Sequence, residues 1–129
     1  MATVSSMPPM LRLSRSIQSG IKVMTAAWQV VYTTSSPVAF LFGGAMIDLS
    51  VMGAADTINI RVRTIDISTG TWGIYDQKPY VGVQPANHPK VHIASIPNTH
   101  GIEIAMQQTA GVLRAITCDF YDAKRLGLA

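Results

Sequence analysis

Apolar and polar residues alternate most clearly in the segment DTINIRVRTIDI, residues 56–67. Its first apolar set is Ile58, Ile60 and Val62. Side chains of a β-strand point alternately to its two faces, so this period of two predicts a half-buried strand. After Thr64 the apolar positions shift to Ile65 and Ile67, which predicts a bulge or bend that returns both sets to the core.

Two later segments, HGIEIAMQQ and VLRAITCDFYDA, show the same alternation on either side of TAG, residues 109–111. The positions predicted to face the core are Ile102, Ile104, Met106, Val112, Ile116, Cys118 and Phe120. Glu103 is predicted to face outward, and Arg114 interrupts the apolar set at a place where it could stay solvated. Two alternating runs around a short turn predict a β-hairpin. In the same way STG, residues 68–70, predicts a hairpin that leads into TWGIYD.

The rest of the chain from residue 21 also has the composition of β-strands. IKVMTAAWQVVYT is rich in β-branched and aromatic residues, whereas YVGVQPANHPKVHIASIPN is divided by prolines and should hold loops and short or edge strands. Turn signals recur about every ten residues, and no long amphipathic helix is indicated. We therefore predict an all-β, antiparallel, jelly-roll-like β-sandwich over residues 21–129.

Residues 1–20 contain paired prolines, several serines and a closing glycine, and this composition predicts an extended N-terminal arm. The excess positive charge of the chain, +3, lies before the first acidic residue, Asp48. A loose solvated tail, a contact to phosphates and an arm that binds a neighbouring subunit are all open interpretations. Basic residues without interleaved aromatics argue against nucleic acid. The candidate residues of an assembly arm are Met10, Leu11, Arg12, Leu13, Arg15 and Ile17.

Charged residues make up only 13% of the chain, about half of the usual share, while the apolar share of 48% is ordinary. A surface so short of charge is a solubility liability for a free monomer. Apolar residues such as Val51 and Met52 also fall in predicted turns. Together these features favour a subunit that buries surface against other copies. The longest apolar window, PVAFLFGGAMI, is too short to span a bilayer, so no membrane association is expected.

The three histidines lie within NHPKVHIASIPNTHG, residues 87–101. On an extended strand His88 and His92 would stand about 13 Å apart, too far to hold one ion. His100 precedes a glycine at the start of a predicted strand. Cys118, the single cysteine, is predicted to be a buried thiol. We therefore expect no metal site within one chain, although a site shared across a symmetry axis stays open.

No set of nucleophile, base and orienting group can be assigned, and the sequence lacks the GxSxG, HExxH and phosphate-loop motifs. We expect neither enzymatic activity nor a cofactor. Trp28 is predicted to lie in the core. Trp72, Tyr75 and Tyr80 could form a ligand loop, for a sugar or another surface ligand, in a monomeric binding module.

The basic N-terminal arm, the DTINIRVRTIDISTGTW hairpin and the GIEIAMQQTAGVLRAITCDFYDA hairpin together resemble the small all-β virion proteins of tailed phages and related viruses. The resemblance covers residues 21–123. It implies a structural protein that decorates or cements a capsid, or builds a collar or tail. Its partners would be further copies of itself and other virion proteins, and it would be made in the host cytoplasm and reside in the virion.

Overall fold

The computed structural model describes residues 10–67 and 70–126, and every regular element among them is a β-strand. The strands are β1 (Met10–Arg15), β2 (Gly20–Val23), β3 (Gln29–Asp48), β4 (Thr57–Ile65), β5 (Gly73–Val81), β6 (Lys90–Ile93), β7 (Ile96–Ala110) and β8 (Ala115–Leu126). All of their pairings are antiparallel, in the order β1-β8-β3-β7-β4-β5, with β2 also beside β8 and β6 also beside β3.

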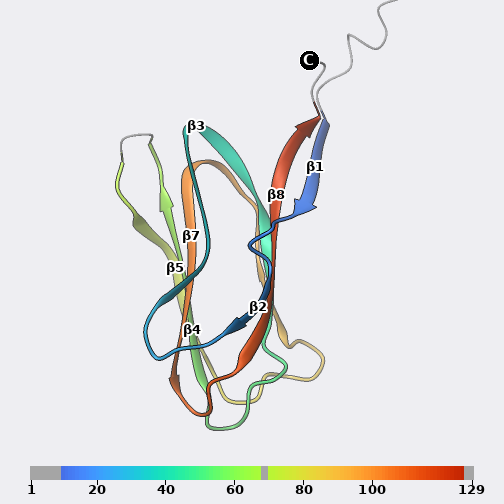
Figure 1. Ribbon diagram of the computed structural model, residues 1–129, viewed down its shortest axis with the longest axis vertical. Helices are drawn as coiled ribbons and strands as arrows, with labels where there is room; N and C mark the ends of the chain where they lie inside the picture. Colours follow the sequence, from blue (N-terminus) through green and yellow to red (C-terminus); the bar gives the residue numbers. More distant parts are fainter. Residues whose placement is uncertain (1–9, 68–69, 127–129) are drawn as a thin grey trace, which may run out of the picture.

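The long strand β3 belongs to both layers of the sandwich. Residues 29–42 pair with β7, whereas residues 42–48 pair with β8 and residues 45–48 also pair with β6. The register with β7 shifts between Ser35 and Phe42, a stretch that contains Pro37. The register with β8 shifts between Phe42 and Ala45, where Gly44 has a positive φ of 108°. This bend carries the chain from the layer of β7, β4 and β5 to the layer of β8 (Figure 1).

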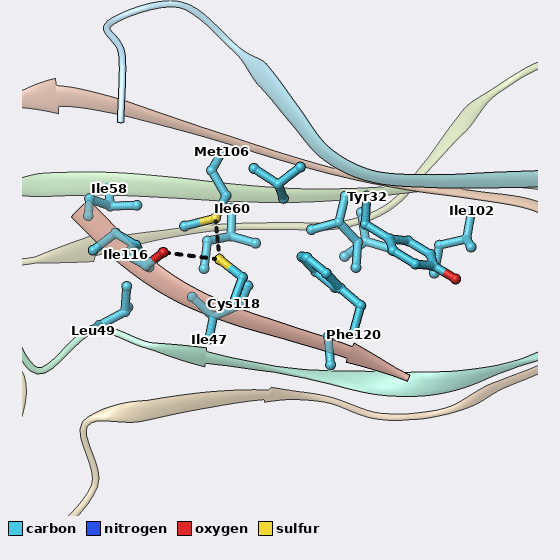
Figure 2. Packing of buried hydrophobic residues seen from close by; sticks show 14 of the residues in the cluster. Tyr32, Ile47, Leu49, Ile58, Ile60, Ile102, Met106, Ile116, Cys118 and Phe120 are labelled. Carbon is cyan, nitrogen blue, oxygen red and sulfur yellow. Dashed lines mark hydrogen bonds between the residues drawn. The ribbon is translucent and has the colours of Figure 1, made fainter. Parts of the chain in front are cut away.

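The core lies between the two layers, whose side chains meet in Figure 2. Met106, Ile60 and Tyr32 come from one layer, and Ile116, Cys118 and Phe120 come from the other. The Tyr32 ring packs against the rings of Phe42 and Phe120, with centroids 5.4 and 4.9 Å away. The predicted all-β, jelly-roll-like sandwich is therefore confirmed.

The alternation in β4 is confirmed, because Ile58, Ile60 and Val62 are all buried. The hairpin between β4 and β5 is confirmed as well. The predicted bulge does not bring both apolar sets inward: buried Thr64 continues the inward face and Ile67 is exposed. The irregularity lies instead on β5, where Ile74 and Asp76 pair with consecutive residues of β4.

The second predicted hairpin is wrong, although its inward residues, except Val112, are buried as predicted. Strands β7 and β8 do not pair with each other, because β3 stands between them. The turn at residues 111–114 therefore joins the two layers. A period of two reports which side chains face the core, and it carries no information about the neighbouring strand.

One side of the sandwich is closed and the other is open. On the closed side the Gln18 side-chain amide bonds the backbone N and O of Thr33 at 3.0 and 2.9 Å, as a paired strand would. On the open side, among the residues that the structure describes, β5 pairs only with β4, and β6 pairs only with β3. Pro79 stands in β5, as expected for an edge strand.

The N-terminal segment contributes a strand to the sandwich. Within the described residues β1 pairs along β8, and Ser16 donates from its backbone N to Phe120 O at 2.7 Å. Residues 1–9 of the predicted arm lie outside the described residues. The division into an arm of residues 1–20 and a domain of residues 21–129 stays a prediction.

Candidate functional site

One end of the sandwich, the lower end in Figure 1, is organised around the carboxylate of Asp56. Asp56 is 1% exposed and accepts hydrogen bonds from Gly53 N at 2.7 Å, Arg114 Nε at 2.6 Å and Val112 N at 3.2 Å. Its backbone O also accepts from Gly82 N at 2.8 Å. A single residue thus joins the β3–β4, β5–β6 and β7–β8 connections.

The electrostatics of Asp56 follow from these donors. The hydrogen bond from Gly53 and the Arg114 guanidinium both favour the charged form, so the pKa of Asp56 lies below its ordinary value of 3.8. Gly111, beside it, has a positive φ of 84°, and a side chain there would collide with Asp56. Arg114 is thereby placed in an ion pair, where the sequence indicated only a solvated interruption.

We call Asp56 and the three connections that it joins the Asp56 hub. Exposed aliphatic side chains surround this hub. We call them the apolar end: Val23, Val51, Val81, Val83, Val112 and Leu113. Val23 joins the group because Val23 pairs with Ala115 and Met24 N bonds Arg114 O at 2.9 Å. Val51 is exposed in its turn as predicted, but its neighbour Met52 is buried in the core. Exposed aliphatic side chains gathered on loops that are bonded together are typical of a contact surface.

The open side of the sandwich holds a cleft of about 210 Å³ between β5 and β6. Core residues Ile60 and Val62 form part of its wall, and β5 contributes Asp76, Lys78 and Tyr80. These three pair with Val62, Ile60 and Ile58, so they share the inward face of the sheet. Strand β6 supplies Val91, His92 and Ile93 from the other layer.

A wider hollow of about 560 Å³ continues from this cleft along the same two strands. Its basic side chains are Lys78 from β5, His88 from the β5–β6 connection, and Lys90 and His92 from β6. The Lys78 ammonium lies 5.4 Å from the centre of the Tyr80 ring. We call this region the basic hollow.

The structure brings together part of the predicted ligand loop. Tyr75 and Tyr80 both line the cleft. Trp72 lies on the other face of the sheet, where its ring is 5.9 Å from the Arg63 guanidinium and close to Gly101. The three aromatic residues therefore do not form one site.

The outer face of the same sheet contains a buried charged group, Glu103. Glu103 is buried, with its Oε1 2.6 Å from Arg63 Nη2 and 3.7 Å from Arg61 Nη2. The Arg61 guanidinium stacks 4.4 Å from the Trp28 ring. Glu103 thus faces outward as predicted, but side chains from the neighbouring strand cover it. The prediction of a core Trp28 is wrong, because its ring packs on Arg61 at this outer face.

The three histidines separate into two places. His88 and His92 line the basic hollow, while His100 Nδ1 lies 3.4 Å from Ser36 O near the bend of β3. Across residues 10–67 and 70–126, no group of three or more His, Cys, Asp or Glu side chains could hold a metal ion. Cys118 is buried as predicted, and burial raises the pKa of its thiol to about 12.

The predicted assembly arm lies at the edge formed by β1, at the other end of the strand order from β5. Met10–Arg15 forms β1, the Arg15 guanidinium is 2.7 Å from Asp119, and Ile17 is exposed. The part of the chain that the structure describes has no helix long and apolar enough to cross a membrane.

The sequence reasoning missed the Asp56 hub, whose only local signal is a Gly-x-x-Asp spacing at the start of a strand.

Comparisons with known proteins agree with this fold. No protein-family model and no curated protein matches the chain. Among solved structures, PirA is similar with a TM-score of 0.58 and 12% identity, over 83% of this chain and 95% of PirA. The VP2 subviral particle of infectious bursal disease virus is similar with a TM-score of 0.51 and 11% identity, over 92% of this chain and 32% of VP2. The chain thus spans about a third of VP2, and identities this low show a shared fold alone.

Proposed function

We propose that this protein is a non-enzymatic structural subunit of a virion, which self-associates on a capsid or related shell as a decoration or cement protein. The apolar end is the observation that carries the proposal. Its exposed aliphatic side chains stand on a chain with only 13% charged residues, and burying them between copies would stabilise an assembly.

The Asp56 hub strengthens this argument. Its hydrogen bonds tie Gly53, Gly82 and Val112 to one residue, so the loops are already ordered before any contact is made. Ordering loops on association costs free energy, and a preorganised surface avoids most of that cost. The apolar end is therefore suited to a stable subunit contact.

The edge opposite β5 supports a role for the predicted arm. Strand β8 pairs with β3 only as far as Asp122, whereas its pairing with β1 continues from Leu13 opposite Ala123 to Met10 opposite Leu126. These last pairs form a two-stranded ribbon that extends beyond the sandwich (Figure 1). An isolated two-stranded ribbon is marginally stable in water, so a neighbouring subunit would stabilise it.

The comparisons support the proposal only through the fold. A sandwich of this kind occurs within VP2, which was solved as a subviral particle. The similarity to PirA has the higher TM-score and gives no indication of a virion. Placement in the virion and partnership with other virion proteins therefore rest on the surface argument.

The native mass of the purified protein, measured by light scattering over a range of concentrations, tests the proposal. We expect a discrete oligomer. Replacing Val112 and Leu113 together by serine should shift the population toward monomer, because their side chains are 68% and 52% exposed at the apolar end. Val38→Ser is a matched control, since Val38 is 71% exposed near the bend of β3.

Two results would contradict the assignment. A monomer at every concentration would favour the monomeric ligand-binding module instead. An oligomer that Val38→Ser weakens as much as the apolar-end variant would show that the contact lies elsewhere.

A further inference from the structure

The basic hollow lies between two strands that each have one edge left unpaired by the described part of the chain. Strand β5 forms one wall, β6 forms the other, and the β5–β6 connection closes the space with Gln84, Pro85 and His88. The walls thus come from opposite layers of the sandwich. Their separation is set by core residues such as Ile60 and Val62, against which Tyr80, Val91 and Ile93 pack.

The charged side chains that line the hollow are all basic. Lys78 and Lys90 line it together with the imidazoles of His88 and His92, and its lining contains no carboxylate. Within the described residues neither lysine has a carboxylate within salt-bridge distance. Two unpaired ammonium groups on facing strands form a site of positive potential.

Two carboxylates, Asp76 and Asp48, lie close to the lysines along the strands, but neither lines the hollow. Asp76 lines the adjoining cleft and not the basic hollow. Asp48 pairs in register with Lys90, but its Oδ1 accepts from Ser50 N at 2.9 Å. The hydrogen bonds from Ser50, more than the charge of Lys90, lower the pKa of Asp48. Asp48 is therefore engaged by its own turn.

The backbone of the hollow favours a small ligand over an added strand. Pro79 interrupts β5 and Pro89 precedes β6, and neither has an N–H to donate. Proline and lysine on an edge strand, together with a bulge, oppose pairing with another chain. The β5 edge combines these features with Lys78 and the irregularity near Tyr75.

We propose that the basic hollow binds the sulfate or phosphate group of a small ligand. Lys78 and Lys90 would contact its oxygens from opposite walls, and His88 and His92 would supply further hydrogen bonds. The Tyr80 ring, beside Lys78, offers an apolar face to the rest of such a ligand. The hollow shares Val81 with the apolar end, but the groups proposed to contact the anion are Lys78, Lys90, His88 and His92, and the proposal does not rest on the protein's role in a virion.

Titration of the full-length protein with sodium sulfate and with sodium phosphate, at constant ionic strength and monitored by backbone amide NMR shifts, tests the proposal. We expect saturable shifts centred on residues 78–92. Lys78→Gln and Lys90→Gln should each weaken binding about tenfold, as for the loss of one charge-assisted hydrogen bond. Lys22→Gln on β2 is the matched control and should leave the affinity unchanged.

Two matched sugars, glucose 6-sulfate and glucose 6-phosphate, distinguish a sulfated ligand from a phosphorylated one. Binding of either one more tightly than its inorganic ion would identify the ligand class. The proposal is overturned if the wild-type shifts do not saturate, or if they occur equally with sodium chloride. It is also overturned if Lys22→Gln weakens binding as much as the hollow variants. Amide spectra of each variant report whether it has kept the fold.

Discussion

At the scale of single residues, the sequence pattern is least informative about the contacts of charged side chains. Glu103 lies between apolar neighbours on the outward parity of its strand, as the sequence indicates, yet Arg61 and Arg63 cover it. These arginines come from β4, which pairs with β7. Their contact with Glu103 depends on strand register, and a single strand's alternation cannot reveal it.

Asp56 should make the stability of the protein depend on pH. Because its pKa is lowered in the folded state, its contribution is present above the ordinary pKa of 3.8 and is lost as the pH falls through the folded value. We expect Asp56→Asn to lower the urea midpoint at pH 7. The difference from wild type should shrink as the pH falls below about 4.

A difference that stays constant from pH 7 to pH 3 would contradict this interpretation of Asp56. Asp66→Asn is a useful control, because Asp66 lies in the connection that follows β4 and takes no part in the hub.

Cys118 should be inert in the native protein. Its thiol is buried against Met106, 3.9 Å away, and its pKa is raised to about 12. Labelling by a thiol reagent at pH 8 should be at least about 1,000-fold slower than in 8 M urea, because it requires unfolding. Rapid labelling without denaturant would mean that the two layers separate readily.

The raised pKa of Cys118 also makes the stability of the fold depend on pH in the alkaline range. A raised pKa stabilises the fold below the ordinary thiol pKa of 9.0, and this contribution is lost as the pH rises toward 12. Tyr32 acts in the same direction: burial and its hydrogen bond to Asp122 at 2.5 Å raise the pKa of the phenol from 10.0 to about 12.

At the scale of elements, β1 and β3 illustrate different limits of local reasoning. The bend in β3 is marked by Pro37 and Gly44, but only the pairings show that the strand changes layers there. For β1, the composition of residues 1–20 indicated only an extended arm. Pairing with β8 supplies the hydrogen bonds that make it a strand.

Removing residues 1–13 should separate assembly from folding. This deletion removes most of β1 but keeps Arg15, Ser16 and Gln18, which bond Asp119, Phe120 and Thr33. We expect an unchanged far-UV spectrum, a urea midpoint close to that of wild type, and a smaller native mass in light scattering. Removal of residues 1–9 leaves β1 whole and serves as the control.

An oligomer of unchanged mass after removal of residues 1–13 would count against the arm as an assembly element. A truncated protein that fails to fold would show instead that β1 is an integral part of the sandwich.

At the scale of the whole molecule, each surface proposed for function is assembled from segments that lie far apart in the sequence. The apolar end gathers residues from several connections around Asp56, and the basic hollow gathers Lys78 and Lys90 from opposite layers. Neither group is contiguous in sequence. The predicted ligand loop, chosen from the contiguous run TWGIYDQKPY, is correspondingly divided between two faces.

The sequence by itself determined that the chain is all-β and which residues of β4, β7 and β8 face the core. It could do so because a strand's side chains alternate with a period of two, whatever strand lies beside it. Tertiary structure alone decided that β3 separates β7 from β8, that Arg61 and Arg63 cover Glu103, and that Lys78 and Lys90 line the same hollow. These features depend on pairings between segments far apart in the chain, and such pairings are selected by the packing of the whole core.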